Sequence, residues 1–197
     1  MNARDTYHHG DLRAVLVAEG LRHLEANGAG NLSLRALAKA AGVSPNAPYR
    51  HFADKDALMG ALAAEGFQIF ARAIVSAAGD APPLAALQAQ GRAYLDFARS
   101  HPALYRLMFS PYGYSLHSLP CQEASARAFG ALVAATAHAQ ASGWKPRRNL
   151  GDAALVFWSA LHGWALILAD GLLPPEVPSP DPDSWLQTFF DQENANF

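Results

Sequence analysis

The stretch Ser33–Phe52, which reads SLRALAKAAGVSPNAPYRHF, constrains the fold of this chain most strongly. Ser33 is a good N-cap, because its hydroxyl can accept a hydrogen bond from a free N–H of the first helical turn. Apolar residues then recur at helical spacing, and Gly42 suits the left-handed conformation that ends a helix. Ser44 and Pro45 are typical of a second helix start. The pattern predicts two short helices joined by a tight turn, the geometry of a helix-turn-helix.

Pro48 conflicts with a regular second helix. A proline four residues after Ser44 lacks the N–H of an α-helical hydrogen bond and crowds the preceding turn. We therefore expect a short, partly 3₁₀ recognition helix with Pro48 in or just past its first turn. The alternative is that Pro45 and Pro48 mark a loop.

The rest of the chain also reads as helices. Alanine and leucine are abundant while β-branched residues are few, which favours an all-α fold of about nine helices. Caps, stops and apolar stripes place the other helices at residues 11–27, 54–78, 83–101, 103–109, 121–142, 152–170 and 182–193. Asp54 is the expected cap of the helix at 54–78, whose expected inward-facing residues are Leu58, Leu62, Phe67, Phe70 and Ile74. Asn27-Gly28, the Gly79–Pro83 segment and Gly143 are the clearest helix stops.

Composition narrows the class of protein. A hydrophobic content of 51% with 16% charged residues excludes a disordered chain. Cys121 is the only cysteine, which is consistent with a reducing compartment, and the polar N-terminus shows no signal peptide, so we expect a cytoplasmic protein. Residues 1–55 carry seven Lys/Arg and five Asp/Glu, whereas residues 56–197 carry eight and twelve. The small basic excess therefore lies with the helix-turn-helix.

Four short motifs surround the helix pair in a fixed order. They are YHHGDLR at 7–13, GVS at 42–44, YRHF at 49–52 and DKDAL at 54–58. In this order and spacing they resemble the DNA-binding domain of the TetR/AcrR family of transcriptional regulators, over residues 7–70. The family more often has a small or hydroxyl residue where this chain has Pro48. The stretch Trp158–Trp164, with its Trp-His-Gly-like pattern, resembles the C-terminal domain of one TetR subgroup.

The resemblance implies a homodimeric DNA-binding transcriptional regulator with no enzyme activity and no cofactor. We expect a helix-turn-helix DNA-binding domain at 1–55 and a larger effector-binding and dimerisation domain at 56–197. The expected partners are double-stranded DNA, an unknown small-molecule effector and a second copy of the chain. The expected mode of action is a repressor that the effector releases from a palindromic operator, whose two half-sites lie about 34–36 Å apart.

Geometry suggests which residues contact DNA, because the N-terminal end of a recognition helix reaches base edges. Asn46 has the amide that pairs with adenine, and Ala47 a methyl group for thymine. Other side chains are better placed for phosphates, which fix register rather than sequence. The full expected set is Ser33, Arg35, Ser44, Pro45, Asn46, Ala47, Tyr49, Arg50, His51 and Lys55. The alternative for each is an ordinary solvated side chain.

An effector pocket is expected between the long helices of the second domain, apolar with a few polar groups that orient the ligand. The candidates are Tyr94, Phe97, Tyr105, Met108, Phe109, Phe129, Trp158 and His162. The alternative for each is an ordinary core position. In the family the last two long helices pair with their symmetry mates in a four-helix bundle. Carried over to this chain, that implies a dimer interface with Phe157, Leu161, Trp164, Leu168, Trp185, Leu186 and Phe189.

The sequence also bears on other classes of function. The apolar run 153–169 reaches the lower length limit of a bilayer span, but no basic cluster flanks it, so no membrane is expected. His8-His9 lacks a further ligand at metal-binding spacing, so no metal is expected. A small-molecule-binding protein or enzyme without DNA function remains an alternative, as does an activator. The sequence shows no paired nucleophile and base that would favour an enzyme.

Overall fold

The structure, a computed structural model, describes residues 12–110, 119–178 and 181–194. Within these residues all regular structure is helical, with eight α-helices and two 3₁₀ helices, close to the expected count of about nine. The elements are α1 (Leu12–Asn27), η2 (Ala29–Asn31), α2 (Leu34–Ala40), η3 (Pro48–Arg50), α3 (Lys55–Ala77), α4 (Pro83–Ser100), α5 (Pro102–Phe109), α7 (Leu119–Ala141), α8 (Leu150–Ala169) and α9 (Pro182–Asn194). The all-α fold class is confirmed.

Two predicted caps set helix starts in the N-terminal part. Ser33 Oγ accepts a hydrogen bond of 3.1 Å from the N–H of Ala36 and begins α2. Asp54 Oδ1 accepts one of 2.8 Å from the N–H of Ala57 and begins α3. Each side chain satisfies a backbone N–H that has no partner within the helix, so these starts depend on local sequence alone.

The start of α8 differs from the expectation. Asn149 Oδ1 accepts hydrogen bonds from the N–H groups of Gly151 at 2.9 Å and Asp152 at 3.3 Å. The helix therefore begins at Leu150 rather than at Asp152. Asparagine is as good a cap as aspartate, and here it comes first along the chain.

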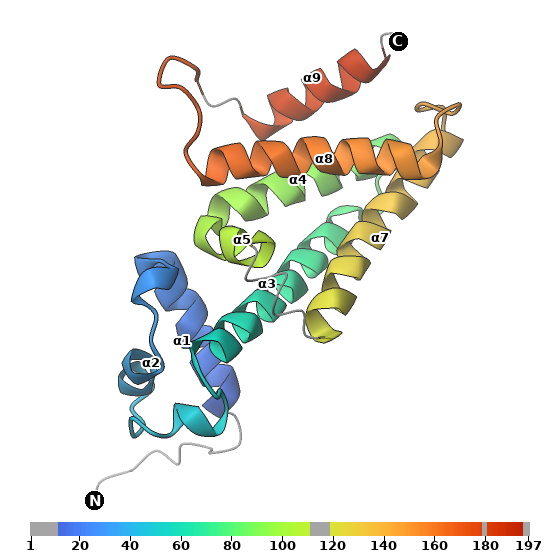
Figure 1. Cartoon of the computed structure of the whole chain (residues 1–197). Coiled ribbons are helices and arrows are strands. Elements are labelled where there is room, and N and C mark those ends of the chain that lie inside the picture. Colours follow the sequence, from blue (N-terminus) through green and yellow to red (C-terminus); the bar gives the residue numbers. More distant parts are fainter. Residues whose placement is uncertain (1–11, 111–118, 179–180, 195–197) are drawn as a thin grey trace, which may run out of the picture.

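The long helix α3 connects two parts of the molecule (Figure 1). Its N-terminal half packs on α1, which also contacts α2 and η3, and its C-terminal half lies among α4, α5 and α7. Helix α8 crosses α4 at the far end, and α9 follows at the edge of the molecule. The buried core is continuous along α3 and includes Leu58, Leu62, Phe67, Phe70 and Ile74, all of which the sequence stripe predicted.

Glycines let other helices approach α3 closely. A Cβ on Gly20 of α1 would lie 2.8 Å from Leu62 Cδ2, and one on Gly66 of α3 would lie 2.8 Å from Leu104 Cδ1 of α5. Real Cβ atoms do not approach so closely, so α1 and α5 both pack on α3 at van der Waals distance.

Two helices of the described residues are long and apolar enough to span a bilayer by length and composition, namely α3 and α8. Helices in the core of other proteins pass the same test, so the finding is weak evidence for a membrane. The two differ in burial, since 56% of the apolar window is buried in α3 but only 33% in α8. Helix α8 therefore leaves much of its apolar surface uncovered within one protomer.

Candidate DNA-reading head and ligand pocket

The second helix of the predicted pair is not an α-helix, and its expected start at Ser44 is wrong. After Gly42, which has a φ of 67°, the Ala47 N–H donates to the Ser44 carbonyl at 3.0 Å. A 3₁₀ helix then covers Pro48–Arg50. Pro48 has no N–H for the Ser44 carbonyl, so an α-helix cannot propagate from that point. The expected 3₁₀ character at Pro48 is confirmed.

Buried side chains fix this short segment to the N-terminal helices. Pro48 and Phe52 are buried, and the Phe52 N–H donates to the Pro48 carbonyl at 3.0 Å. The guanidinium of Arg13 in α1 lies 5.4 Å from the centre of the Phe52 ring. Tyr49 is turned outward, with 47% of its surface exposed. We call this segment, residues 44–52, the reading head. The buried rings of Pro48 and Phe52 hold it in place, while most of its other residues are exposed to solvent.

All ten expected DNA-contact residues lie in the described part of the chain, and they are exposed except for Ala47, which is half-buried. Lys55 has a structural contact as well, because its Nζ donates to the Gly30 carbonyl at 3.2 Å. It joins the start of α3 to the turn after α1. The motif residues His8 and His9 lie outside the described residues.

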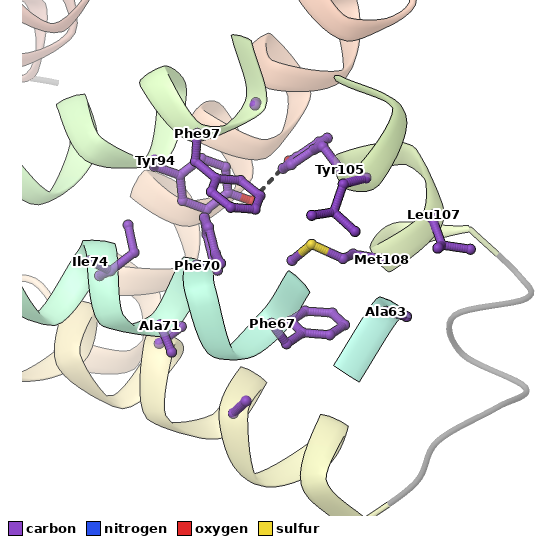
Figure 2. Close-up of a cluster of buried hydrophobic side chains, with 14 of the residues drawn as sticks. Ala63, Phe67, Phe70, Ala71, Ile74, Tyr94, Phe97, Tyr105, Leu107 and Met108 are labelled. Atoms are coloured by element: carbon purple, nitrogen blue, oxygen red, sulfur yellow. Dashed lines mark hydrogen bonds between the residues drawn. The ribbon is translucent and has the colours of Figure 1, made fainter. Parts of the chain in front are cut away.

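A cavity of about 350 Å³ lies among α3, α4, α5, α7 and α8. Figure 2 shows its α3, α4 and α5 walls, where apolar side chains point toward one another. The lining residues are Phe67, Phe70, Ile74, Tyr94, Met108, Phe109, Ser125, Ala126, Ala128, Phe129, Leu132, Leu155 and Trp158. Its size and apolar walls are those of a small-molecule site.

The expected effector residues divide into two groups. Those that line the cavity are Tyr94, Met108, Phe109, Phe129 and Trp158. Phe97, Tyr105 and His162 do not line it. Phe97 packs on Phe70 and on His101, with ring centres 5.1 Å apart in both cases. Tyr105 is fully buried behind the wall.

Sequence reasoning missed the remaining lining residues. The apolar stripe of α3 predicts Phe67, Phe70 and Ile74 as core residues, because such a stripe looks the same whether it faces a filled core or an open cavity. Sequence reasoning named only Phe129 from α7, although Ser125, Ala128, Phe129 and Leu132 recur at helical spacing. This helical spacing is the signal in the sequence that could have identified α7 as a wall of the cavity.

Three polar groups meet beside the cavity. The Tyr94 hydroxyl lies 3.0 Å from the Tyr105 hydroxyl and 2.9 Å from His162 Nδ1. The Tyr105 hydroxyl lies 2.7 Å from the same Nδ1. The His162 ring stacks on Trp158 with ring centres 5.0 Å apart and meets Phe109 at 4.6 Å. The cluster therefore includes one cavity-lining residue, Tyr94, and contacts two others, Trp158 and Phe109.

Burial keeps this cluster uncharged. Desolvation lowers the pKa of His162 below its usual 6.5, which favours the neutral imidazole. Desolvation also raises the pKa of the Tyr105 phenol, with further contributions from Tyr94. Among the described residues that line the cavity, none carries a formal charge.

Helix α5 joins the cavity to the N-terminal helices. The carboxylate of Glu25 in α1 accepts hydrogen bonds from the N–H groups of Leu104 at 3.0 Å and Ala103 at 3.3 Å. These are free N–H groups of the first turn of α5, where the helix dipole favours an anion. The other end of α5 carries Met108 and Phe109 of the cavity wall. A second cavity, of about 480 Å³, lies at this junction between η2, α3 and α5, and charged side chains line part of it.

The surface of α8 is divided among several neighbours. Leu155 and Trp158 face the cavity, and Phe157, Leu161 and Ala165 are fully buried. A remaining row recurs at helical spacing and is exposed or half-buried, and we call it the α8 stripe: Val156, Ser159, Ala160, Gly163 and Ile167. No contact within the described protomer buries this row.

The expected dimer-interface residues need a correction. Phe157 and Leu161 are 0% exposed and Leu186 is 3% exposed, so these side chains are enclosed within the protomer. The other four are half-buried: Trp164, Leu168, Trp185 and Phe189. Trp164 and Trp185 stack in parallel with ring centres 6.0 Å apart, which holds α9 on α8. The apolar face that the sequence assigned to a partner is in large part the α8–α9 contact.

Two family descriptions match the chain. Residues 16–62 match the bacterial regulatory proteins of the tetR family, and residues 87–192 match a tetracyclin repressor-like C-terminal domain. A comparison with curated proteins yields no match.

Solved structures resemble the chain along nearly its whole length. A Rhodococcus protein of unknown function is 34% identical, with a TM-score of 0.79 and 96% of each chain covered. The TetR family regulator PfmR from Thermus thermophilus is 19% identical, with a TM-score of 0.67 over 90% of this chain and 96% of that one. The fatty acid degradation regulator FadR from Bacillus halodurans is 14% identical, with a TM-score of 0.69 over 93% and 95%. The last two similarities concern the fold.

Proposed function

This chain belongs to the TetR family of bacterial regulatory proteins, and we propose that it is a homodimeric repressor that a small molecule releases from its operator. DNA-binding transcriptional regulation follows from the family. The repressor role, the dimer and the release by a ligand are the proposal. The observation that carries it is the apolar cavity between α3 and α8, which shares α5 with the contact to the N-terminal helices.

We propose the division into a DNA-binding domain at 1–55 and an effector-binding and dimerisation domain at 56–197. Helix α3 begins at Lys55, so the boundary falls at its N-terminus. The first turns of α3 nevertheless pack on the N-terminal helices, as the close approach of Leu62 to Gly20 indicates. Movement of α3 is therefore expected to move the reading head as a unit.

A second copy of the chain is the proposed partner of the α8 stripe. Its small side chains at Ser159, Ala160 and Gly163 permit close approach of two helices, and Val156 and Ile167 supply apolar area at the ends. Burial of this row would complete the coverage of a helix that has no charged residue from 153 to 169.

The proposed release passes through α5. A ligand that fills the cavity presses on Met108 and Phe109, and α5 transmits the displacement to Glu25 in α1. Such a shift lowers DNA affinity only if the ligand binds the DNA-free arrangement more tightly than the DNA-bound one.

Glu25→Ala tests this link. Removal of the carboxylate leaves two N–H groups of α5 without their cap, so α5 moves without carrying α1. We expect unchanged ligand affinity but a smaller effect of ligand on DNA affinity, which in coupled systems is about 5–150-fold. The measurement is DNA anisotropy across a titration of an inducing ligand found by screening. Glu19→Ala is the control, because Glu19 lies on the same helix and pairs locally with Arg22; equal coupling in wild type and Glu25→Ala would reject the route.

Selection from random DNA duplexes tests the function as a whole. The purified protein is expected to enrich an inverted repeat and to bind it with an affinity that falls steeply as salt rises, since phosphate contacts release counterions. A reporter gene behind the enriched sequence should be repressed by the protein. Binding with no sequence preference would contradict an operator-specific regulator, and activation of the reporter would contradict the repressor role.

Asn46→Ala is expected to reduce sequence preference more than overall DNA binding. Its amide is exposed in the turn before η3, and loss of a bidentate base contact costs about 1–3 kcal/mol of discrimination. Lys55→Ala is the comparison, because a lost phosphate contact weakens all duplexes alike and lowers the salt slope by about one. The measurement is anisotropy with operator and scrambled duplexes; equal losses on both duplexes in Asn46→Ala would reject a base contact.

A further inference from the structure

We infer that a second copy of the chain closes the open side of the cavity, so that a ligand is fully enclosed only in the dimer. The inference rests on the proposed function, since it gives the partner of the α8 stripe a part in the ligand site. Its consequence is that ligand binding and dimerisation strengthen each other. Three observations support it: the place where the cavity opens, the exposed apolar side chains at that place, and its position beside the α8 stripe.

The cavity opens between α7 and α8, which diverge from the turn that joins them (Figure 1). The lining residues of α3, α4 and α5 are buried, apart from the half-buried Phe109. The exposed residues of the described lining all belong to α7 or α8, and we call their surface the cavity mouth: Ala126, Phe129 and Leu155. Phe129 and Trp158 meet edge to face between the two helices, with ring centres 6.2 Å apart.

Exposed apolar side chains gather at the cavity mouth. In the described part of the chain seven large apolar side chains are exposed, and three of them lie at the mouth or next to it. Leu155 and Phe129 of the mouth are 51% and 41% exposed, and Val156 of the α8 stripe is the third. Exposed apolar surface that is contiguous in this way is typical of a protein–protein contact.

The cavity mouth borders the α8 stripe. Leu155 directly precedes Val156 and lies four residues before Ser159, and both of these belong to the stripe. Residues four apart on a helix are neighbours, with Cβ atoms about 5–6 Å apart. A helix with its side chains is about 10–12 Å wide. A second α8 that packs on the stripe is therefore wide enough to reach the mouth as well.

This cover makes ligand affinity depend on the dimer. In one protomer a ligand at the cavity mouth keeps part of its surface in water, and the partner removes that part from water. A tenfold gain in affinity needs about 55 Å² of additional apolar burial at about 25 cal/mol per Å². This is a fraction of the about 150–250 Å² that one aromatic side chain buries. Because binding free energies are reciprocal, each bound ligand lowers the dimer dissociation constant by the same factor.

Binding of N-phenyl-1-naphthylamine tests this dependence. The probe carries no charge, as do the described lining residues, and its fluorescence rises in apolar sites. Gly163→Arg places a charge in the α8 stripe and is expected to be monomeric, and Gly130→Arg is the control. Neither glycine lines the cavity, and Gly163 lies about 12 Å along α8 from Leu155 at 1.5 Å per residue. We expect at least tenfold weaker binding to Gly163→Arg and unchanged binding to Gly130→Arg.

Sedimentation of the wild-type chain with and without the probe makes the same comparison without a substitution. The probe is expected to lower the dimer dissociation constant at least tenfold for each site that it occupies. This measurement keeps the test intact if Gly163→Arg folds poorly.

The reaction rate of an introduced thiol tests where the partner lies. The one natural cysteine, Cys121, is buried, so Leu155→Cys adds an accessible thiol at the cavity mouth. Its reaction with N-ethylmaleimide is expected to be at least tenfold slower in the dimer than in the same variant combined with Gly163→Arg. Val75→Cys is the control, because Val75 of α3 is exposed and does not line the cavity, so its thiol should react equally fast in both forms.

Equal probe affinity for monomer and dimer, no binding to either, or equal reactivity of the Leu155→Cys thiol in both forms would overturn the inference. Mass and release of operator DNA, measured in parallel, separate this result from a failure of the proposed function. A dimer that the probe releases from DNA without preferring the dimeric form leaves the proposed function standing and rejects the inference. A probe that prefers the dimer but releases no DNA at saturation supports the inference and contradicts the effector role. A wild-type chain that stays monomeric contradicts the proposed dimer and the inference together.

Discussion

Replacement of Gly163 by arginine is expected to yield a monomer and to lower operator affinity by about 100-fold or more, because two linked reading heads bind more tightly than one by factors of this order. Gly163 lies in the middle of the α8 stripe, and apart from the adjacent residues and backbone of α8 no atom lies within 4 Å of the position that its Cβ would take. The arginine side chain therefore fits the isolated protomer. In a dimer it would place an unpaired charge between two apolar helices.

Light scattering after size exclusion measures the mass, and anisotropy measures the affinity for the selected operator. Gly130→Arg is a matched control, since Gly130 is also an exposed helical glycine, in α7, with open space around its Cβ position. The control should remain dimeric. A dimeric Gly163→Arg with full operator affinity would place the dimer contact on another face of the molecule.

Phe157→Ala is expected to destabilise the protomer by about 3–5 kcal/mol, the usual loss for a buried phenylalanine. Phe157 is 0% exposed, and its ring lies 5.3 Å from the rings of both Phe189 and Phe190 in α9. A Cβ on Gly91 of α4 would lie 2.8 Å from Phe157 Cζ, so the ring fills the junction of three helices. Loss of the Phe157 ring leaves a cavity between α4, α8 and α9, which the three helices cannot fill by moving closer.

Denaturant unfolding at two protein concentrations measures this effect and separates it from dimerisation. A change inside the protomer lowers the transition midpoint similarly at both concentrations, whereas a change at a dimer interface acts through the concentration dependence. Val156→Ala is the control, because Val156 precedes Phe157 in the chain but lies on the α8 stripe, where it is 39% exposed. A loss below about 1 kcal/mol in Phe157→Ala would contradict its place in the core.

Local chemistry was readable from the sequence where a side chain acts on its own backbone. Ser33 and Asp54 cap helices as predicted, because the hydrogen bond spans three residues and needs no tertiary partner. Pro48 has the expected 3₁₀ conformation for the same local reason. The expected helix start at Ser44 failed because the missing N–H of Pro48 outweighs a favourable cap.

The candidate site was readable in part. Tyr94, Met108 and Trp158 were expected near a ligand because aromatic and sulfur side chains lie between long helices, and they line the cavity. Periodicity could not place Phe97 away from it or Phe67 within it, because an apolar stripe is the same whether the opposite wall is filled or open. Likewise, the N–H groups that donate to Glu25 belong to Ala103 and Leu104, which are 78 and 79 residues away along the chain, so no local pattern predicts these hydrogen bonds.

The sequence by itself determined the helical fold class, most of the helix starts and stops, and the TetR family, because all three depend on local spacing and on motifs in a fixed order. Tertiary structure alone decided which face of α8 lies against α9 and which stays uncovered. A helix that is apolar on every side has no amphipathic direction, so only the packing of α4 and α9 around Phe157 and Leu161 distinguishes its buried side from the α8 stripe.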